Sequence, residues 1–232
     1  MDGIEVNHIS HNDEDVKKVI EFSPALTLTE EKRNEICEDA LKIAKHVGYR
    51  SAGTLEFLVD KDNNHYFIEM NPRIQVEHTV TELVTGIDLV QSQILIAEGY
   101  SLDSKEIGIP SQDSIKPRGA AIQCRITTED PTNNFMPDTG KIDVYRNGAG
   151  FGIRHDGGNG FAGAVISPYY DSLLVKTTAY SRTFEDARRK AIRSIKELTI
   201  TGVKTNVDFL INVLNDCLLY TSPSPRDTER SR

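Results

Sequence analysis

The spacing of apolar residues along the chain predicts four amphipathic helices. Residues 29–48 combine acidic side chains in the first turn with apolar residues at helical spacing and a glycine where a C-terminal cap belongs. The same spacing predicts a helix over residues 79–99, although Gly86 lies inside it. Two more helices are predicted over residues 183–198 and 205–216. Each begins with a threonine followed three residues later by an aspartate, which is a capping signal.

Alternating apolar and polar residues predict strands between these helices. The stretch "GTLEFLVDKDNNHYFIEM", residues 53–70, reads as two strands around a turn that is rich in Asp and Asn. Residues 109–118 are polar and contain proline, so we expect a connector there. Three further strands are predicted over residues 120–128, 141–146 and 173–180. Strands and helices mixed in this order indicate an α+β fold.

One segment concentrates polar side chains at alternate positions. In "HYFIEMNPRIQVEH", residues 65–78, these are Glu69, Asn71, Arg73, Gln75 and Glu77. An extended strand would place all five on one face. Two interpretations are open. The face is either the solvated side of an amphipathic strand, or a site whose carboxylates, amides and guanidinium act on an anionic substrate.

The hairpin register indicates a metal site. If the loop is the four residues "KDNN", Phe57 lies opposite Ile68 and Glu56 lies opposite Glu69. Opposed residues have Cβ atoms roughly 4.5–5.5 Å apart, so two like charges there are destabilising unless a cation lies between them. Mg²⁺ or Mn²⁺ suits this pair, with Asn71 as a further oxygen ligand. A slip of one residue would send Glu56 to the other face.

Composition limits the possible functions. The 232 residues are 38% hydrophobic and 27% charged, with a formal net charge of −8. This acidic balance argues against binding to nucleic acid or to an anionic membrane, and no apolar run reaches membrane-spanning length. The cysteines Cys37, Cys124 and Cys217 have no paired spacing, which suggests a reducing compartment. We therefore expect a cytoplasmic protein, or one of the mitochondrial matrix if the source is eukaryotic.

Several motifs resemble a known enzyme family. The stretches "FIEMNPRIQVEHTVTELVTGIDLV", "QCRITTEDP", "SPYYDSLLVK" and "GVKTNVDFLINVL" are similar to the biotin carboxylase part of the biotin-dependent carboxylases. The resemblance covers roughly residues 17–214. "CRITTEDPTNNFMPDTG" and "ISPYYDSLLVK" look most like the branch that carboxylates pyruvate.

The resemblance implies an organisation of the chain into an ATP-grasp part and a biotin carboxylase C-terminal domain. The expected segments are an unrelated-looking N-terminus at 1–16, a partial ATP-grasp domain at 17–108, the connector at 109–118, a C-terminal α/β domain at 119–219 and a disordered or artefactual tail at 220–232. The family's glycine-rich flap over ATP has no counterpart before residue 17. We therefore expect residues 1–232 by themselves to have little or no activity.

The implied activity is that of an ATP-dependent ligase. In this family ATP and bicarbonate form carboxyphosphate, and its CO₂ passes to a biotin held on a separate carboxyl carrier domain. Magnesium or manganese assists, and the acceptor suggested by the motifs is pyruvate, giving oxaloacetate. We also expect the parent protein to be a homo-oligomer. Two alternatives remain: the same half-reaction in an acyl-CoA carboxylase, and a non-catalytic module that binds a structural cation such as Ca²⁺.

Nine residues match functional positions of the family. The metal set is Glu56, Glu69 and Asn71, the catalytic set is Arg73, Glu77 and Arg125, and the bicarbonate-side set is Gln75, Val76 and Lys18. The resemblance implies that Glu77 deprotonates bicarbonate and that Arg125 stabilises the biotin oxyanion. Lys18 departs from the pattern because Glu14, Asp15 and Val16 precede it where the family has Arg-Arg-His.

Overall fold

The computed structural model describes residues 18–216, which form two compact units. The first unit contains residues 23–118, and the second contains residues 18–22 together with residues 119–216. The segments 1–16 and 220–232 and the residue Cys217 lie outside the described residues. The domain boundaries set out above remain predictions.

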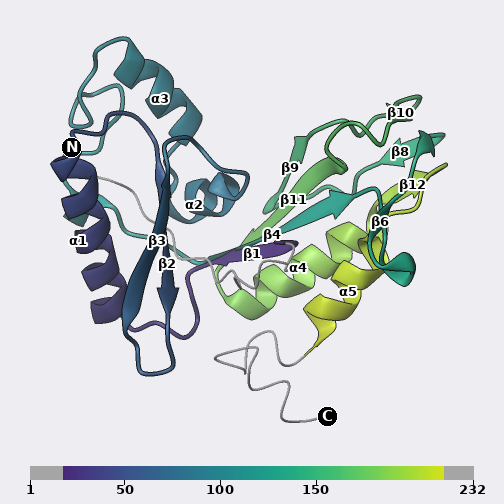
Figure 1. The fold of residues 1–232 in the computed structure, drawn as a ribbon, viewed down its shortest axis with the longest axis horizontal. Helices are drawn as coiled ribbons and strands as arrows, with labels where there is room; N and C mark the ends of the chain where they lie inside the picture. The colour runs from purple at the N-terminus through teal and green to yellow at the C-terminus, as the bar shows by residue number, and fades with distance from the viewer. Residues whose placement is uncertain (1–17, 217–232) are drawn as a thin grey trace. The chain divides into compact units, whose positions relative to one another are not determined.

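The first unit is built around a β-hairpin and three α-helices (Figure 1). Its elements are α1 (Glu30–His46), β2 (Thr54–Val59), β3 (His65–Asn71), α2 (His78–Thr85), α3 (Leu89–Ala97) and the 3₁₀ turn η1 (Gln112–Ser114). The predicted helix over residues 29–48 is confirmed as α1. The Thr29 hydroxyl accepts from the Lys32 N–H at 3.2 Å, and Gly48 adopts the left-handed conformation at φ 63°.

The prediction of one helix over residues 79–99 is wrong. Gly86 has φ 73° and ends α2, because its N–H bonds back to the Glu82 carbonyl. Asp88 then caps α3 by accepting from the Gln91 N–H at 2.7 Å. The two helices meet at a bend of 95°. Among residues 18–216 no single helix has the length and apolar composition to cross a membrane. The bent pair α2 and α3 meets these two criteria only when its helices are counted together.

The second unit is a four-stranded sheet with two helices packed on it. The sheet order is β1-β4-β11-β9, formed by β1 (Ile20–Ser23), β4 (Ala120–Thr127), β11 (Leu173–Ser181) and β9 (Ile153–Gly157). Strand β11 pairs antiparallel with both β4 and β9. The remaining elements are β5 (Glu129–Asp130), η2 (Pro131–Asn133), β6 (Met136–Pro137), β7 (Gly140–Lys141), β8 (Val144–Arg146), β10 (Val165–Ile166), α4 (Phe184–Glu197), β12 (Thr199–Thr201) and α5 (Val207–Asn215).

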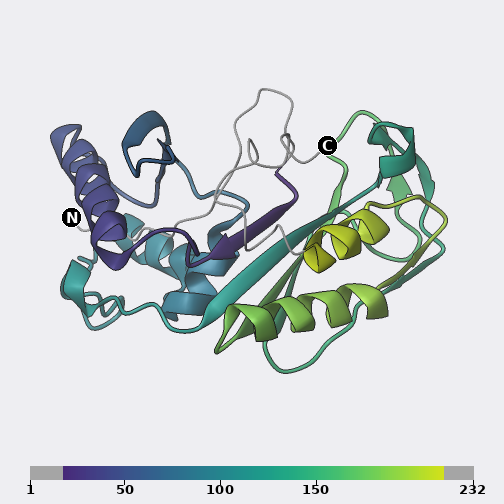
Figure 2. The same ribbon diagram turned by 90° about the horizontal axis from the view of Figure 1, so that it is seen from below.

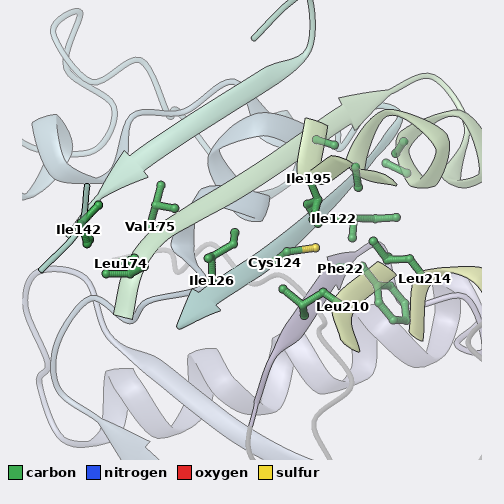
Figure 3. Close-up of a cluster of buried hydrophobic side chains, with 14 of the residues drawn as sticks. Phe22, Ile122, Cys124, Ile126, Ile142, Leu174, Val175, Ile195, Leu210 and Leu214 are labelled. Carbon is green, nitrogen blue, oxygen red and sulfur yellow. The ribbon is translucent and has the colours of Figure 1, made fainter. Parts of the chain in front are cut away.

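The core of the second unit lies between one face of this sheet and the two helices (Figures 2 and 3). Its fully or almost fully buried side chains include Ile122, Cys124, Ile126, Leu174, Ala187, Ile195, Leu210 and Leu214. The β4 members are at even positions, so Gln123 and Arg125 belong to the opposite face of the strand. Helices α4 and α5 are also joined directly, because the Arg188 guanidinium donates to the Leu214 carbonyl at 2.6 Å.

Several predicted elements of this unit need correction. The strand expected over residues 141–146 is divided between β7 and β8, which pair with different partners. The helix expected from residue 205 is capped at Asn206, whose side chain instead bonds to two backbone groups of β4. The cap of α4 is confirmed, since the Thr183 hydroxyl accepts from the Asp186 N–H. Strands β1 and β9 were not predicted.

Candidate functional site

The acidic pair lies at the end of the hairpin that is remote from its turn. The predicted opposition of Glu56 and Glu69 is confirmed by the pairing of β2 with β3. The loop length and the pairing near the turn differ from the prediction. Asp60 and Asn64 are joined by a backbone hydrogen bond of 2.9 Å, so the loop has three residues instead of four. Asn63 adopts the left-handed conformation at φ 62°, which three-residue hairpin loops require.

A β-bulge restores the register before the strands reach the acidic pair. Because of the shorter loop, Phe57 pairs with Phe67 and not with Ile68. Between that pair and Glu56 the register shifts by one residue, and Ile68 is the residue left over. Glu56 therefore meets Glu69 as predicted, although the predicted pairs between the bulge and the turn are all shifted by one.

Two amides join the carboxylates into a polar cluster. The Asn71 amide nitrogen donates to Glu69 Oε1 at 2.9 Å and to Glu56 Oε1 at 3.3 Å. The Gln75 amide nitrogen donates to the same Glu56 oxygen at 3.2 Å. The two carboxylates therefore converge on one amide group, and we call Glu56, Glu69, Asn71 and Gln75 the acidic cluster. Glu56 is half-buried in it, whereas Glu69 is exposed.

The acidic cluster fits a hard divalent cation. Carboxylate and amide oxygens are the ligands that Mg²⁺ and Mn²⁺ prefer, and Mg²⁺ commonly takes only one or two carboxylates with water or phosphate completing its shell. A carboxamide can present its oxygen in place of its NH₂ group, so Asn71 suits either the carboxylates alone or a cation between them. Among the described residues, no group of three or more His, Cys, Asp and Glu side chains has metal-binding geometry. A cation here would therefore depend on the carboxylate pair with amide support.

The prediction of one extended polar face through residue 77 is wrong. Strand β3 ends at Asn71, and Pro72 begins a bend that leads into α2. Arg73 is exposed, with its guanidinium 3.4 Å from the Ile74 carbonyl, and it is not part of the acidic cluster. Val76 is half-buried in the turn before the helix. Gln75 does lie with the two carboxylates, as predicted, but it reaches them from the bend after β3 and not as a member of the strand.

Glu77 occupies the N-cap position of α2 and is buried, with 7% of its surface exposed. The His78 ring nitrogen Nδ1 lies 2.7 Å from the Gln75 carbonyl at the start of this helix. Further along α2, the Glu82 carboxylate accepts from the Leu89 N–H at 2.7 Å and so ties α2 to the start of α3.

Arg125 and Lys18 belong to the second unit, whereas the other seven candidate residues belong to the first. Lys18 is half-buried and lies two residues before the start of β1. The Arg125 guanidinium forms an ion pair with Glu21 on β1, and Gln123 donates to the same carboxylate at 2.9 Å. Sequence reasoning missed Glu21 because β1 is only four residues long and its burial gives no charge pattern along the chain.

Two other ionisable groups of the second unit, Cys124 and Asp130, have shifted pKa values that packing and local hydrogen bonds explain. Burial raises the pKa of the Cys124 thiol, so this cysteine stays protonated and packs as a small apolar residue. The ammonium of Lys204 hydrogen-bonds to Asp130 and, with Thr132, holds the pKa of that carboxyl at about 2. The acidic run in "CRITTEDP" is therefore tied to the loop before α5.

Two family models match the chain in succession. Residues 5–105 match the ATP-binding domain of the carbamoyl-phosphate synthase L chain, and residues 123–222 match the biotin carboxylase C-terminal domain. The chain is 58% identical over 197 residues to pyruvate carboxylase of Bacillus subtilis and 61% identical over 198 residues to that of Pichia angusta. Each match covers 85% of this chain and 17% of the relative.

Solved structures agree with these matches. A complete multifunctional pyruvate carboxylase from Rhizobium etli superposes with a TM-score of 0.85 at 45% identity, over 91% of this chain and 22% of that one. The biotin carboxylase domain dimer of 2-oxoglutarate carboxylase from Hydrogenobacter thermophilus, solved with MgADP, ADP and bicarbonate, gives a TM-score of 0.83 at 43% identity. That match covers 88% of this chain and 44% of the other.

The fold and the matched regions together define the class of protein: the chain carries part of an ATP-grasp domain followed by a biotin carboxylase C-terminal domain. It spans about a sixth of the length of the curated relatives named above. Within its class, this region is most like pyruvate carboxylase.

Proposed function

We propose that the chain is the part of a pyruvate carboxylase that contributes to its biotin carboxylase half-reaction, which the complete enzyme carries out and residues 1–232 by themselves do not. In this reaction ATP and bicarbonate supply a carboxyl group to biotin, which then delivers it to pyruvate. The observation that carries the proposal is the acidic cluster, in which Glu56 and Glu69 converge on the Asn71 amide within a chain 58% identical to a pyruvate carboxylase. The MgADP and bicarbonate bound by the 2-oxoglutarate carboxylase domain support the same substrate classes here.

The acidic cluster would hold Mg²⁺ or Mn²⁺ through Glu56, Glu69 and Asn71. A bound divalent cation would neutralise negative charge on the nucleotide phosphates. Gln75 has a second role, because its amide holds Glu56 in place from the turn before α2. Placing one carboxylate with two amides fixes its direction before any ligand binds, which is the preorganisation that catalysis requires.

Proton transfer and anion binding fall to the segment that follows β3. Buried Glu77 is the proposed base for bicarbonate, and the helix start around it excludes water from its carboxylate. Arg73 is the proposed cation for the bicarbonate or phosphate charge, since a guanidinium stays ionised and offers a fork of donors. Val76 and Lys18 are proposed to contact the bicarbonate side, and Arg125 to stabilise the biotin anion.

Pyruvate is the proposed acceptor, and the carboxyl carrier domain with its biotin is the proposed partner. The alternative of an acyl-CoA carboxylase shares the first half-reaction, but the relatives named above are pyruvate carboxylases. A homo-oligomeric parent, located in the cytoplasm or the mitochondrial matrix, is part of the proposal. The dimer formed by the 2-oxoglutarate carboxylase domain supports the oligomer.

A chimera provides the test. Residues 18–216 of this chain would replace the matching region of the complete Bacillus subtilis pyruvate carboxylase, to which the chain is 58% identical. We expect this parental chimera to cleave ATP in a bicarbonate-dependent reaction that added biotin accelerates, and to form oxaloacetate from pyruvate. Replacing the base, Glu77→Gln, should lower kcat by about 100-fold or more, the usual contribution of a general base.

The control variant is Glu98→Gln, which removes an exposed carboxylate after α3. It should keep the parental rate. A Glu77→Gln chimera that turns over within twofold of this control would refute the role of Glu77 as a base. Retained Mn²⁺ binding in the Glu77→Gln chimera would separate lost proton transfer from a lost metal site, whereas a purely structural cation module would show no change in either measurement.

A further inference from the structure

The second unit contains a buried carboxylate to which the proposed function assigns no role. Glu21 lies on β1 with 1% of its surface exposed. One of its oxygens forms the ion pair with the Arg125 guanidinium, and the other accepts from the Gln123 amide at 2.9 Å. Both partners come from β4, on the face opposite the apolar core. Glu21 is therefore directed at a proposed substrate-binding arginine and away from the packing of the core.

The backbone of Arg125 is held independently of this ion pair. Its N–H donates to the Val19 carbonyl at 3.0 Å, and its carbonyl accepts from the Asn206 side chain at 2.9 Å. Asn206 is fully buried and also accepts from the Thr127 N–H at 3.0 Å. Strand β4 is thus fixed at this position from both sides. These backbone contacts do not set the direction of the Arg125 guanidinium, and 18% of the Arg125 side chain is exposed.

Stability alone does not explain a buried ion pair at this position. The cost of removing two charges from water largely offsets their attraction, and well-packed apolar residues are often equally stable. The pair does supply orientation. A guanidinium is planar and carries five N–H donors in a fixed fork, so a contact with one carboxylate sets the direction of all of them. Donors fixed in advance stabilise a developing anion without reorganisation at the moment of reaction.

We propose that Glu21 is a positioning residue for Arg125. It holds the guanidinium plane in the orientation in which Arg125 acts on the biotin anion, and Gln123 holds the Glu21 carboxylate in turn. The inference rests on the proposed function for the role of Arg125, whereas the pairing of Glu21 with Arg125 and Gln123 is a property of the described structure.

The test compares two rates in the chimera described above. The first is ATP cleavage with bicarbonate in the absence of biotin, and the second is carboxylation of free biotin. Glu21→Gln keeps the size of the side chain and a partner for Gln123 but removes the charge that orients Arg125. We expect it to lower kcat for biotin carboxylation at least tenfold more than it lowers the biotin-independent ATP cleavage.

The matched control is Glu185→Gln. Glu185 also pairs with an arginine in the second unit, Arg188, at 2.7 Å, and both residues belong to α4. This variant should leave the ratio of the two rates unchanged. If Glu21→Gln also leaves this ratio unchanged, because it lowers the two rates by the same factor, the role of Glu21 is structural and the inference is overturned.

A double-mutant cycle decides whether Glu21 acts through Arg125. In an Arg125→Gln background, Glu21→Gln should cost less than a further twofold in biotin carboxylation, because no guanidinium remains to be oriented. An equal loss in both backgrounds, as from misfolding, would overturn the inference. A parental chimera that carboxylates no biotin, under conditions in which the unaltered Bacillus subtilis enzyme does so, would overturn the proposed function and with it the inference.

Discussion

Removing one charge from the acidic cluster should stabilise the chain and weaken metal binding at the same time. In the absence of a cation, Glu56 and Glu69 repel each other across the hairpin. Two unit charges about 5 Å apart in a water-like dielectric interact by about 0.8 kcal/mol. Glu69 is exposed, so this dielectric applies. We therefore expect Glu69→Gln to raise the free energy of unfolding by about 0.5–1 kcal/mol at low ionic strength.

The sign should reverse when manganese is added. A ligand present at 100 times its dissociation constant stabilises the folded state by about 2.7 kcal/mol. The unaltered chain should gain this stabilisation from Mn²⁺, and Glu69→Gln should gain little of it because one of the two carboxylate ligands is lost. The measurement is urea unfolding of residues 1–232 with and without MnCl₂, at low salt and again at 0.5 M NaCl, where the repulsion should be screened.

The control is Asp62→Asn, which removes an exposed charge from the turn of the same hairpin. It should leave the Mn²⁺-dependent stabilisation unchanged. A Glu69→Gln variant that is less stable than the unaltered chain without metal would contradict the repulsion between the carboxylates. Equal stabilisation by Mn²⁺ in both proteins would show that the cluster does not bind the ion.

Two further predictions concern the second unit. Asn206→Ala should lower the free energy of unfolding by about 2–4 kcal/mol, because it leaves two backbone groups of buried β4 without their partner; in chemical denaturation, a cost no larger than that of exposed Asn215→Ala would contradict this. The second prediction follows from Asp130, whose pKa is depressed to about 2 chiefly by its hydrogen bond from Lys204. The stabilisation is present above the unfolded pKa of about 4 and is lost as the pH falls toward 2, so the difference in urea midpoint between the unaltered chain and Lys204→Met should shrink over that range. A difference at pH 2 that is as large as the one at pH 6 would rule out this pair as its source.

Local patterns predicted the elements whose signals are local. The cap and apolar stripe of α1, the Thr183 cap of α4 and strand β4 all depend on neighbours a few residues apart. The opposition of Glu56 and Glu69 was predicted from a loop of the wrong length, and the bulge at Ile68 compensated for that error. A register count assumes an uninterrupted ladder, and nothing in the sequence near Ile68 marks an extra residue.

Features that depend on distant segments were not predictable in this way. Gln75 was expected beside Glu69 and Asn71, but its route was not: the chain turns after Pro72, and Gln75 reaches Glu56 from outside the strand. Glu21 meets Arg125 across roughly a hundred residues of sequence, through a four-residue strand with no periodicity to detect. The roles of the candidate residues therefore still rest on the family resemblance, and the variants described above are what can test them.

The bulge at Ile68 should allow the turn of the hairpin to change in length without changing the pairing of Glu56 with Glu69. A residue gained or lost at the turn changes which side chains pair between the turn and the bulge, and a bulge can absorb such a step. Related sequences should therefore vary in turn length without loss of metal binding, while tolerating few insertions between the bulge and Pro72. The hairpin can thus diversify its solvent-facing tip and keep the spacing of its two acids.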